Sequence, residues 1–133
     1  MAMQHTFDTP TINHLFVYGT LMSGQSRFNQ LEPYVLSQKE ASVRGHLHHL
    51  GRYPGMKVGD GVVHGQLMEV RDVEACLEQM DSIEGFLGFG RNDSLFDRTI
   101  VQIETEQDTV WAWTYVYAGE VADDSIIDDG RWN

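Results

Sequence analysis

The feature that most restricts how this chain can fold is a series of short apolar runs separated by glycine-rich turns. Runs of this length, bounded by turn-forming residues, are typical of β-strands joined by tight loops. The pattern predicts strands over residues 14–18, 43–50, 62–70, 98–104 and 110–117. Many short strands with glycine-rich turns favour a small, partly closed barrel with helices packed on it.

The strongest of these strands, over residues 110–117, alternates regularly between large aromatic and smaller side chains. Successive side chains of a strand point to opposite faces, so the aromatic residues share one face. We expect this face to form core or barrel wall, with a tyrosine hydroxyl able to point into a pocket. The aromatic face consists of Trp111, Trp113, Tyr115 and Tyr117.

A helical period is clear over residues 72–82, where apolar side chains recur at spacings of four and three. Asp72 is predicted to act as the N-cap of this helix. A shorter helix is expected over residues 25–32, broken near Pro33. The apolar stripe of the longer helix consists of Val73, Leu77 and Met80.

The charge of the chain argues against two classes of partner. Lys and Arg together number 9 and Asp and Glu number 20, which gives a formal net charge of −11. Nucleic-acid backbones and anionic membranes are bound through clustered basic residues, so we expect neither partner. Cys76 is the only cysteine, which excludes an internal disulfide and a multi-cysteine zinc site and favours a cytoplasmic location.

The length of 133 residues, with 41% hydrophobic residues, is sufficient for one domain with its own core. We therefore expect a single domain over residues 1–133, in which residues 1–12 form a flexible leader. The start of the chain has no signal-peptide pattern, and no run is long enough for a spanning helix. Cys76 lies beside the apolar stripe of the predicted helix and is expected in the core.

Glu84 is the first candidate for chemistry. It follows Val73 by eleven residues, which places it about 20° from the apolar stripe on a helical wheel, and Gly85 then marks a helix end. A carboxyl there would be partly buried near the negative end of the helix dipole, and both effects raise its pKa. A raised carboxyl pKa suits a general acid or base at neutral pH. The alternative is that the helix frays at Ser82 and that Glu84 is a solvated loop residue.

The second candidate is the turn formed by Tyr18, Gly19, Thr20 and Leu21 after the first strand. Gly19 is expected to permit an unusual φ and to let a ligand approach the backbone. Consecutive N–H groups in such a turn can bind an anion such as a carboxylate. The alternative is an ordinary connection between a strand and a loop.

The third candidate is a group of histidines. His46 and His48 face the same way on a predicted strand, and with His64 they suggest a metal site. Asp60 is the nearest acid in sequence, and no second His-x-His occurs. An exposed polar strand face is therefore the preferred interpretation.

Taken together, these segments resemble the gamma-glutamylcyclotransferase-like family over residues 14–132. The matching segments are Phe16-Val17-Tyr18-Gly19-Thr20-Leu21, Tyr53-Pro54-Gly55, Val63-His64-Gly65-Gln66-Leu67, Met80-Asp81-Ser82-Ile83-Glu84-Gly85, Phe96-Asp97-Arg98, Ala112-Trp113-Thr114-Tyr115-Val116-Tyr117 and Asp129-Gly130-Arg131-Trp132. The opening turn combined with the Asp-x-x-Glu-Gly element is the most specific part of this resemblance.

The resemblance implies an α+β fold: a small mixed barrel of five to six strands, one or two short flanking helices, and a cavity at the end of the first strand. It implies an enzyme that releases 5-oxoproline and an amine from a small-molecule γ-glutamyl substrate, without metal or cofactor. Glu84 matches the general acid/base, and Tyr115 matches a pocket hydroxyl. The resemblance also implies that the turn formed by Tyr18, Gly19, Thr20 and Leu21 holds the α-carboxylate and neighbouring groups of the γ-glutamyl moiety. The sequence is also compatible with a homodimer.

Two segments depart from the family pattern. Phe96 stands where the family usually has a tyrosine, and the glycine-rich segment 86–95 is long, so both bear on the identity of the substrate. Two other classes of function stay open at this point. One is a non-catalytic module that binds an amino-acid derivative, and the other is a metal enzyme built on His46, His48 and His64.

Overall fold

The elements of the fold are given by a computed structural model that describes residues 11–133. The strands are β1 (His14–Val17), β2 (Val35–His49), β3 (Pro54–Val70), β4 (Phe96–Glu104) and β5 (Thr109–Tyr117). The helices are α1 (Phe28–Leu31) and α2 (Val73–Glu84), and the 3-10 helices are η2 (Glu32–Tyr34) and η3 (Asp123–Ser125).

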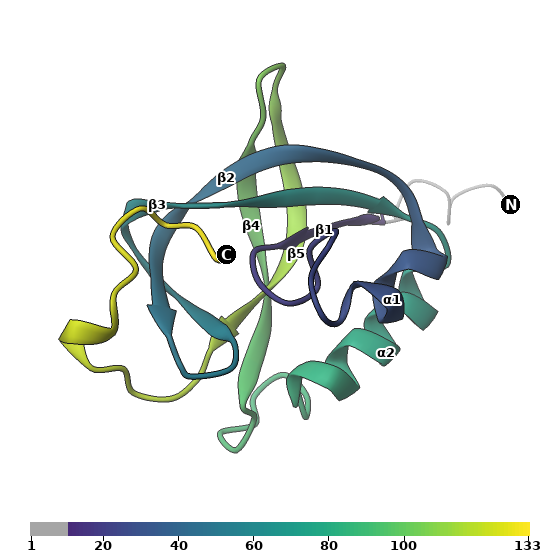
Figure 1. Cartoon of the computed structure of the whole chain (residues 1–133). Helices are drawn as coiled ribbons and strands as arrows, with labels where there is room; N and C mark the ends of the chain where they lie inside the picture. Colours follow the sequence, from purple (N-terminus) through teal and green to yellow (C-terminus); the bar gives the residue numbers. More distant parts are fainter. Residues whose placement is uncertain (1–10) are drawn as a thin grey trace, which may run out of the picture.

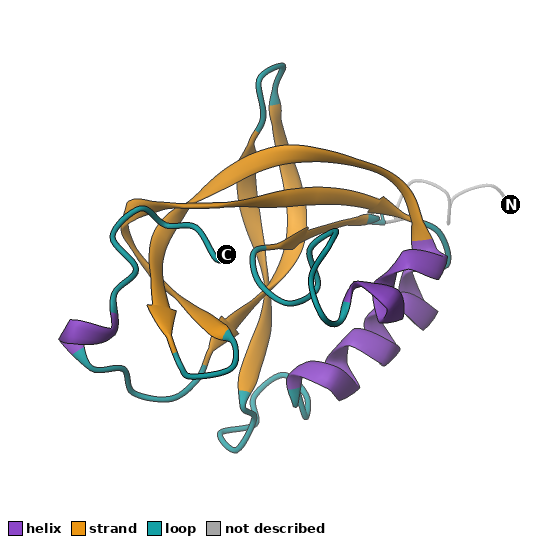
Figure 2. Ribbon diagram, in the orientation of Figure 1, coloured by secondary structure: helices purple, strands orange, loops and turns teal. Residues whose placement is uncertain are grey.

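The five strands form a closed barrel in the order β1-β3-β2-β4-β5 (Figure 1). Neighbouring strands are antiparallel except β1 and β5, which run parallel and pair at Leu15 and Trp113. Strands β2 and β4 meet only at Ser42 and Glu104. Helices α1 and α2 lie together on one flank of the barrel, and the 3-10 helix η3 lies on the opposite side (Figure 2). The expected α+β fold, with a small mixed barrel and short helices beside it, is confirmed.

Two strands are longer than the sequence predicts. Residues 37–40, in the first half of β2, are exposed and polar. This half is a strand because it pairs with β3, with Lys39 opposite Leu67. Strand β3 likewise begins at Pro54 and runs through Gly59 and Gly61, ahead of the predicted start at residue 62. A Cβ at either glycine would collide with the imidazole of His46, so these glycines make room for a ring and do not form a turn.

Helix α2 begins after Asp72 and ends before Gly85, both as predicted. Gly85 adopts a left-handed conformation with φ 69°, and its N–H donates to the carbonyl of Asp81, as at many helix ends. Asp72 occupies the predicted N-cap position, and its carbonyl accepts the Cys76 N–H at 2.9 Å, but its φ is 47° and its side chain makes no capping hydrogen bond. The predicted helix over residues 25–32 is reduced to α1, and the 3-10 helix η2 continues past Pro33.

The two faces of β5 belong to two different cores. Ala112 and Thr114 point into the barrel and are fully buried, and the Thr114 hydroxyl donates to the carbonyl of Phe16 at 2.9 Å. Tyr115 lies on the opposite face, in a second core between the barrel and the helices. The aromatic face is therefore the outer wall of the barrel, and it emerges into solvent at Trp111, which is 55% exposed.

Helix α2 supplies the other side of the second core. Leu77 and Met80 from the predicted stripe are buried there, together with Cys76, which is a fully buried free thiol, as expected. Val73 is only partly buried at the edge of this core. Burial of apolar side chains on one side of a helix stabilises its docking by roughly 1.5–3 kcal/mol for each large side chain.

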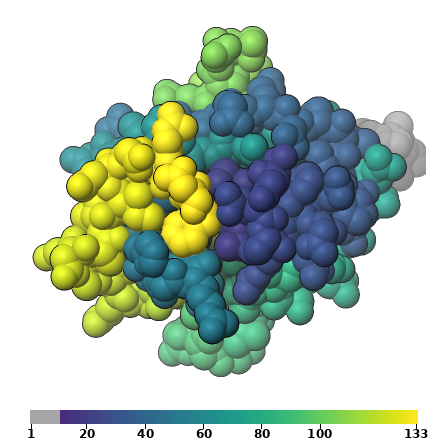
Figure 3. Space-filling model, in the orientation of Figure 1, coloured from purple at the N-terminus to yellow at the C-terminus, as the bar shows by residue number. Residues whose placement is uncertain are grey.

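The segment after β5 returns across the barrel and packs beside the turn that follows β1 (Figure 3). The Ile127 N–H donates to the carbonyl of Leu47 at 2.7 Å, and the His64 N–H donates to the carbonyl of Gly130 at 2.8 Å. Trp132 packs on the ring of His49 with a centroid distance of 5.3 Å. These contacts close one side of the barrel with the end of the chain.

The expected leader lies largely outside the described residues, which begin at Thr11. Within the described part, the carbonyl of Ile12 accepts a hydrogen bond from the indole of Trp113 at 3.2 Å, which ties residue 12 to the barrel wall. None of the helices found between residues 11 and 133 has the length and apolar character needed to cross a bilayer.

We predict that Gly130→Ala will lower the free energy of unfolding more than Gly24→Ala does. Both glycines have positive φ, +66° and +85°, which costs a non-glycine residue about 1–2 kcal/mol. A Cβ at Gly24 would meet nothing within 4 Å, whereas one at Gly130 would overlap the carbonyl oxygen of Val62. Urea denaturation of both variants measures the difference, and equal losses would show that the end of the chain does not pack on β3.

Candidate active site

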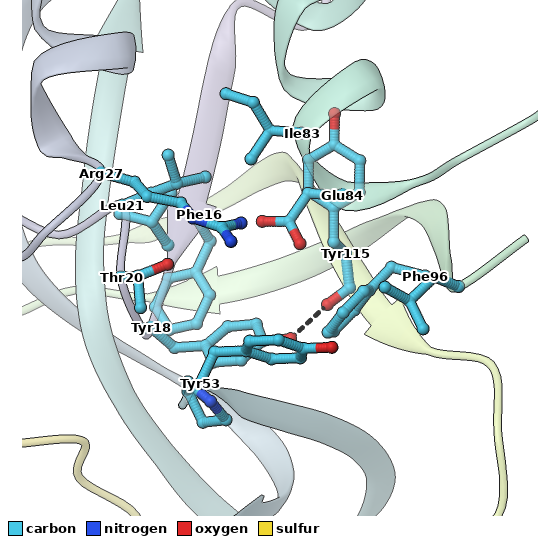
Figure 4. A pocket seen from close by; sticks show the side chains of 14 residues that line it. Phe16, Tyr18, Thr20, Leu21, Arg27, Tyr53, Ile83, Glu84, Phe96 and Tyr115 are labelled. Atoms are coloured by element: carbon cyan, nitrogen blue, oxygen red, sulfur yellow. Dashed lines mark hydrogen bonds between the residues drawn. The ribbon is translucent and has the colours of Figure 1, made fainter. Parts of the chain in front are cut away.

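A cavity of about 140 Å³ opens at the end of β1 (Figure 4). A single water needs roughly 10–15 Å³ measured in this way, so the cavity has room for a small organic molecule. Its walls come from the turn after β1, the loop before β3, the end of α2 and the start of β4. The lining residues are Phe16, Val17, Tyr18, Gly19, Thr20, Leu21, Arg27, Tyr53, Pro54, Ile83, Glu84, Leu95, Phe96 and Tyr115.

Glu84 is the last residue of α2, and its carboxyl points into this cavity (Figure 4). The helix does not fray at Ser82, so the interpretation of Glu84 as a solvated loop residue was wrong. Burial in the apolar wall raises the pKa of Glu84 from 4.5 to about 7, and the nearby Arg27 guanidinium opposes this rise. At neutral pH the carboxyl is therefore poised between its neutral and ionised forms.

A network of polar groups anchors the end of α2 to the barrel. Arg98 of β4 donates to Asp81 through Nε at 2.8 Å and through Nη2 at 3.2 Å. The hydroxyl of Tyr115 donates to the same carboxylate at 2.6 Å. Burial and this hydrogen bond raise the pKa of Tyr115. Tyr115 thus lines the cavity with its ring, while its hydroxyl is used to hold Asp81.

Tyr18 also has its hydroxyl engaged inside the protein. It donates to the carbonyl of Tyr115 at 2.7 Å and accepts from the N–H of Met56 at 3.2 Å. Burial raises the pKa of this hydroxyl, so it stays protonated. Tyr18 therefore connects three strands beneath the cavity, and its phenol ring, not its hydroxyl, is available to a ligand.

The turn itself is built differently from the prediction. Gly19 does not have a positive φ, so the expected unusual backbone conformation was wrong. A Cβ at Gly19 would lie 2.6 Å from Cγ of Pro54, so glycine is required because the neighbouring loop packs closely on the turn. Among residues 11–133, the N–H groups of Thr20 and Leu21 donate to no other protein group. They remain available to a ligand in the cavity.

Three residues that shape this site, Arg27, Asp81 and Arg98, are not predicted as site residues by the sequence. Arg27 is the one basic residue of the lining and reaches the cavity from the loop after the turn (Figure 4). Asp81 and Arg98 both occur in the segments that resemble the family, but nothing in their spacing indicates that they form an ion pair. Tyr53 and Phe96 pack together at one edge, with ring centroids 6.0 Å apart.

The three histidines do not come together. His46 contacts Asp60 at 3.1 Å, while His48 is buried and shares a hydrogen bond of 2.8 Å with Ser125. His64 lies opposite Ser42, farther along the sheet. Over the described range 11–133, no group of three or more His, Cys, Asp or Glu side chains is arranged to hold a metal ion. The structure does not assemble the metal site considered as an alternative.

These features define a small β-barrel protein with a ligand pocket in which one sheltered carboxyl faces one guanidinium. Residues 15–133 match the family model described as "Gamma-glutamyl cyclotransferase, AIG2-like". This chain therefore belongs to the AIG2-like gamma-glutamyl cyclotransferase family. An AIG2-like protein from Mus musculus has the same fold, with a TM-score of 0.73 over 93% of this chain and 90% of that chain at 21% identity.

Two relatives in sequence carry related names. The chain is 36% identical over 105 residues to the gamma-L-glutamyl-butirosin B gamma-glutamyl cyclotransferase of Niallia circulans, a match that covers 78% of this chain and 66% of that protein, just under two thirds of its length. It is 37% identical over 123 residues to a Vibrio cholerae protein provisionally named a gamma-glutamylcyclotransferase, covering 91% of this chain and 96% of that one.

We predict that Glu84→Gln will stabilise the protein at about pH 8.5 and that this gain will shrink toward about pH 5. The folded-state pKa of about 7 lies above the ordinary 4.5, so ionising Glu84 in the folded state disfavours folding above pH 7. That penalty is lost as the pH falls from 7 through 4.5 and the carboxyl protonates. Urea denaturation of the wild type and the variant at both pH values should show a difference of about 1–3 kcal/mol at the higher pH.

The matched control is Glu78→Gln, which removes an exposed carboxylate from the same helix. It should change stability by a small amount that varies little with pH between the two conditions. If Glu84→Gln behaved like this control, the carboxyl of Glu84 would be solvated and ionised at neutral pH, contrary to its burial in the cavity wall.

Proposed function

We propose that this protein cyclises γ-glutamyl compounds and releases 5-oxoproline and an amine, with Glu84 as the general acid/base. The observation that carries the proposal is a carboxyl with a pKa of about 7, held in a cavity beside a turn in which the main-chain N–H groups of Thr20 and Leu21 have no hydrogen-bond partner among residues 11–133. A general acid/base works best when its pKa lies near the operating pH. Membership of the gamma-glutamyl cyclotransferase family supports this reaction class.

In the proposed reaction, the α-ammonium of the γ-glutamyl group first gives a proton to Glu84. The resulting amine attacks its own γ-carbonyl carbon, which closes a five-membered ring and places negative charge on the carbonyl oxygen. The bond between that carbon and the departing nitrogen then breaks, and Glu84 returns the proton to this nitrogen. The ring nitrogen, which carries two hydrogens after the attack, loses one of them to solvent and becomes the lactam N–H of 5-oxoproline. One carboxyl therefore acts as base and then as acid, a role typically worth about 10²–10⁴-fold in rate.

The remaining rate enhancement comes from holding the substrate in a folded conformation. Nucleophile and electrophile belong to one molecule, so the reaction requires no metal or cofactor. A cavity that holds them in reactive geometry contributes roughly 7–11 kcal/mol in well-oriented cases. The free N–H groups of Thr20 and Leu21 are suited to bind oxygen atoms of the γ-glutamyl group, including the developing oxyanion.

We predict that Glu84→Gln will lower 5-oxoproline release by at least about 10²-fold, because glutamine cannot carry the proton. The assay is a panel of γ-glutamyl peptides, γ-glutamylamines and γ-glutamyl aminoglycosides, with 5-oxoproline quantified by chromatography. The aminoglycosides are included because the Niallia circulans relative is named for gamma-L-glutamyl-butirosin B. In the wild type, kcat/KM should rise with pH through about 7, as Glu84 ionises to its base form.

Glu78→Gln serves as the matched variant, since Glu78 is exposed on α2 away from the cavity. Full turnover by Glu84→Gln would remove Glu84 from the mechanism. If the wild type bound 5-oxoproline but released none from any compound in the panel, the protein would be a binding module for amino-acid derivatives and not an enzyme.

A further inference from the structure

Arg27 occupies the wall of the cavity opposite Glu84. The main chain after β1 folds back on itself, and the Arg27 N–H donates to the carbonyl of Thr20 at 2.8 Å. This hydrogen bond sets the start of the Arg27 side chain beside the turn. Its guanidinium then lies over the ring of Tyr53, with 5.9 Å to the ring centroid. A main-chain hydrogen bond and the contact with the Tyr53 ring together position Arg27 at the cavity.

The charge of Arg27 has no partner within residues 11–133. The salt bridges of this part of the chain join His46 to Asp60, Arg91 to Asp93 and Arg98 to Asp81. The guanidinium of Arg27 and the carboxyl of Glu84 point toward one another across the cavity without forming a salt bridge (Figure 4). Arg27 and Glu84 are the one basic and the one acidic residue of the lining. The cavity therefore presents a guanidinium and a carboxyl that face one another without a salt bridge between them.

A γ-glutamyl group carries a matching pair of charges. Its α-carbon bears an ammonium and a carboxylate side by side, and the proposed reaction requires the ammonium to lie at Glu84. The carboxylate on the same carbon then lies within the same small cavity. A guanidinium is well suited to a carboxylate because its N–H groups donate two parallel, charge-assisted hydrogen bonds.

We propose that Arg27 binds the free α-carboxylate of the substrate and restricts the site to γ-glutamyl compounds in which this carboxylate is not blocked. This inference rests on the proposed function for the identity of the ligand. It makes Arg27 a specificity-determining residue, because a substrate with an amide in place of the α-carboxylate would leave the guanidinium without its partner. Compounds in which the glutamyl residue continues through its α-carboxyl into a peptide would be excluded for the same reason.

The test measures binding of 5-oxoproline, which has the free carboxylate, and of 5-oxoprolinamide, which has a carboxamide there. Isothermal titration calorimetry on the wild type should show that the carboxylate form binds roughly 10- to 100-fold more tightly, as expected for charge-assisted hydrogen bonds. In Arg27→Gln this preference should largely disappear, and in Arg27→Lys part of it should return. Arg44→Gln removes an exposed positive charge from β2, away from the cavity, and should keep the full preference.

Arg27 also lowers the pKa of Glu84, so its removal changes the ionisation of the cavity. Repeating the titrations of all four proteins in the Glu84→Gln background removes this effect. The loss of the preference for the carboxylate form on Arg27→Gln should persist there. Thermal unfolding of each variant shows that the fold is intact before binding is measured. If the preference survived in Arg27→Gln, or if the wild type bound neither compound, the proposed role of Arg27 would be wrong.

The outcome is separable from that of the proposed function. A wild type that releases no 5-oxoproline, yet binds it in a manner that depends on Arg27, would overturn the proposed reaction and support the carboxylate site. Turnover that depends on Glu84 but shows the same preference for carboxylate over carboxamide in Arg27→Gln would support the reaction and overturn the role of Arg27.

Discussion

The contact of Asp81 with Arg98 is the interaction on which the rest of the site depends. Asp81 lies one turn before Glu84 on α2, so the ion pair that joins this helix to β4 also sets how deeply Glu84 enters the cavity. Tyr115 donates a further hydrogen bond to Asp81, which connects the helix to β5. Aromatic rings shield the Arg98 guanidinium from water and so strengthen its attraction to the carboxylate. The rings within 5.2 Å of it are Phe86, Phe89 and Trp113.

The chemistry of the cavity depends on which of its polar groups already make hydrogen bonds within the protein and which do not. The hydroxyls of Tyr18 and Tyr115 hold the frame together and keep their protons. Among residues 11–133, the lining groups without a hydrogen-bond partner are the Glu84 carboxyl, the Arg27 guanidinium, the hydroxyls of Thr20 and Tyr53, and main-chain N–H groups of the turn. Burial raises the pKa of Glu84 and the facing guanidinium limits that rise, and the balance of these two effects lies near neutrality.

Prediction from the sequence succeeded where a residue's neighbours along the chain decide its environment. The alternation along β5 and the period of α2 located these two elements to within about two residues of their observed ends. Prediction failed where the conformation of a segment depends on residues far away in the sequence that pack or pair with it. The polar first half of β2 is a strand because β3 lies beside it, and Gly59 is in a strand because the ring of His46 covers it. Asp72 is at the predicted N-cap position, but its backbone is left-handed and its side chain makes no capping hydrogen bond.

The sequence alone determined the barrel-and-helix architecture, the end of α2 at Gly85 and the position of Glu84 beside the apolar stripe. Each of these depends on the periodicity of apolar residues and on local backbone preference, which can be recognised in the sequence without knowledge of tertiary contacts. Only the tertiary structure decided that Gly19 is required by Pro54, that the tyrosine hydroxyls are engaged internally, and that Arg27 faces Glu84. These features join residues far apart in the chain, and their distances depend on how the barrel closes.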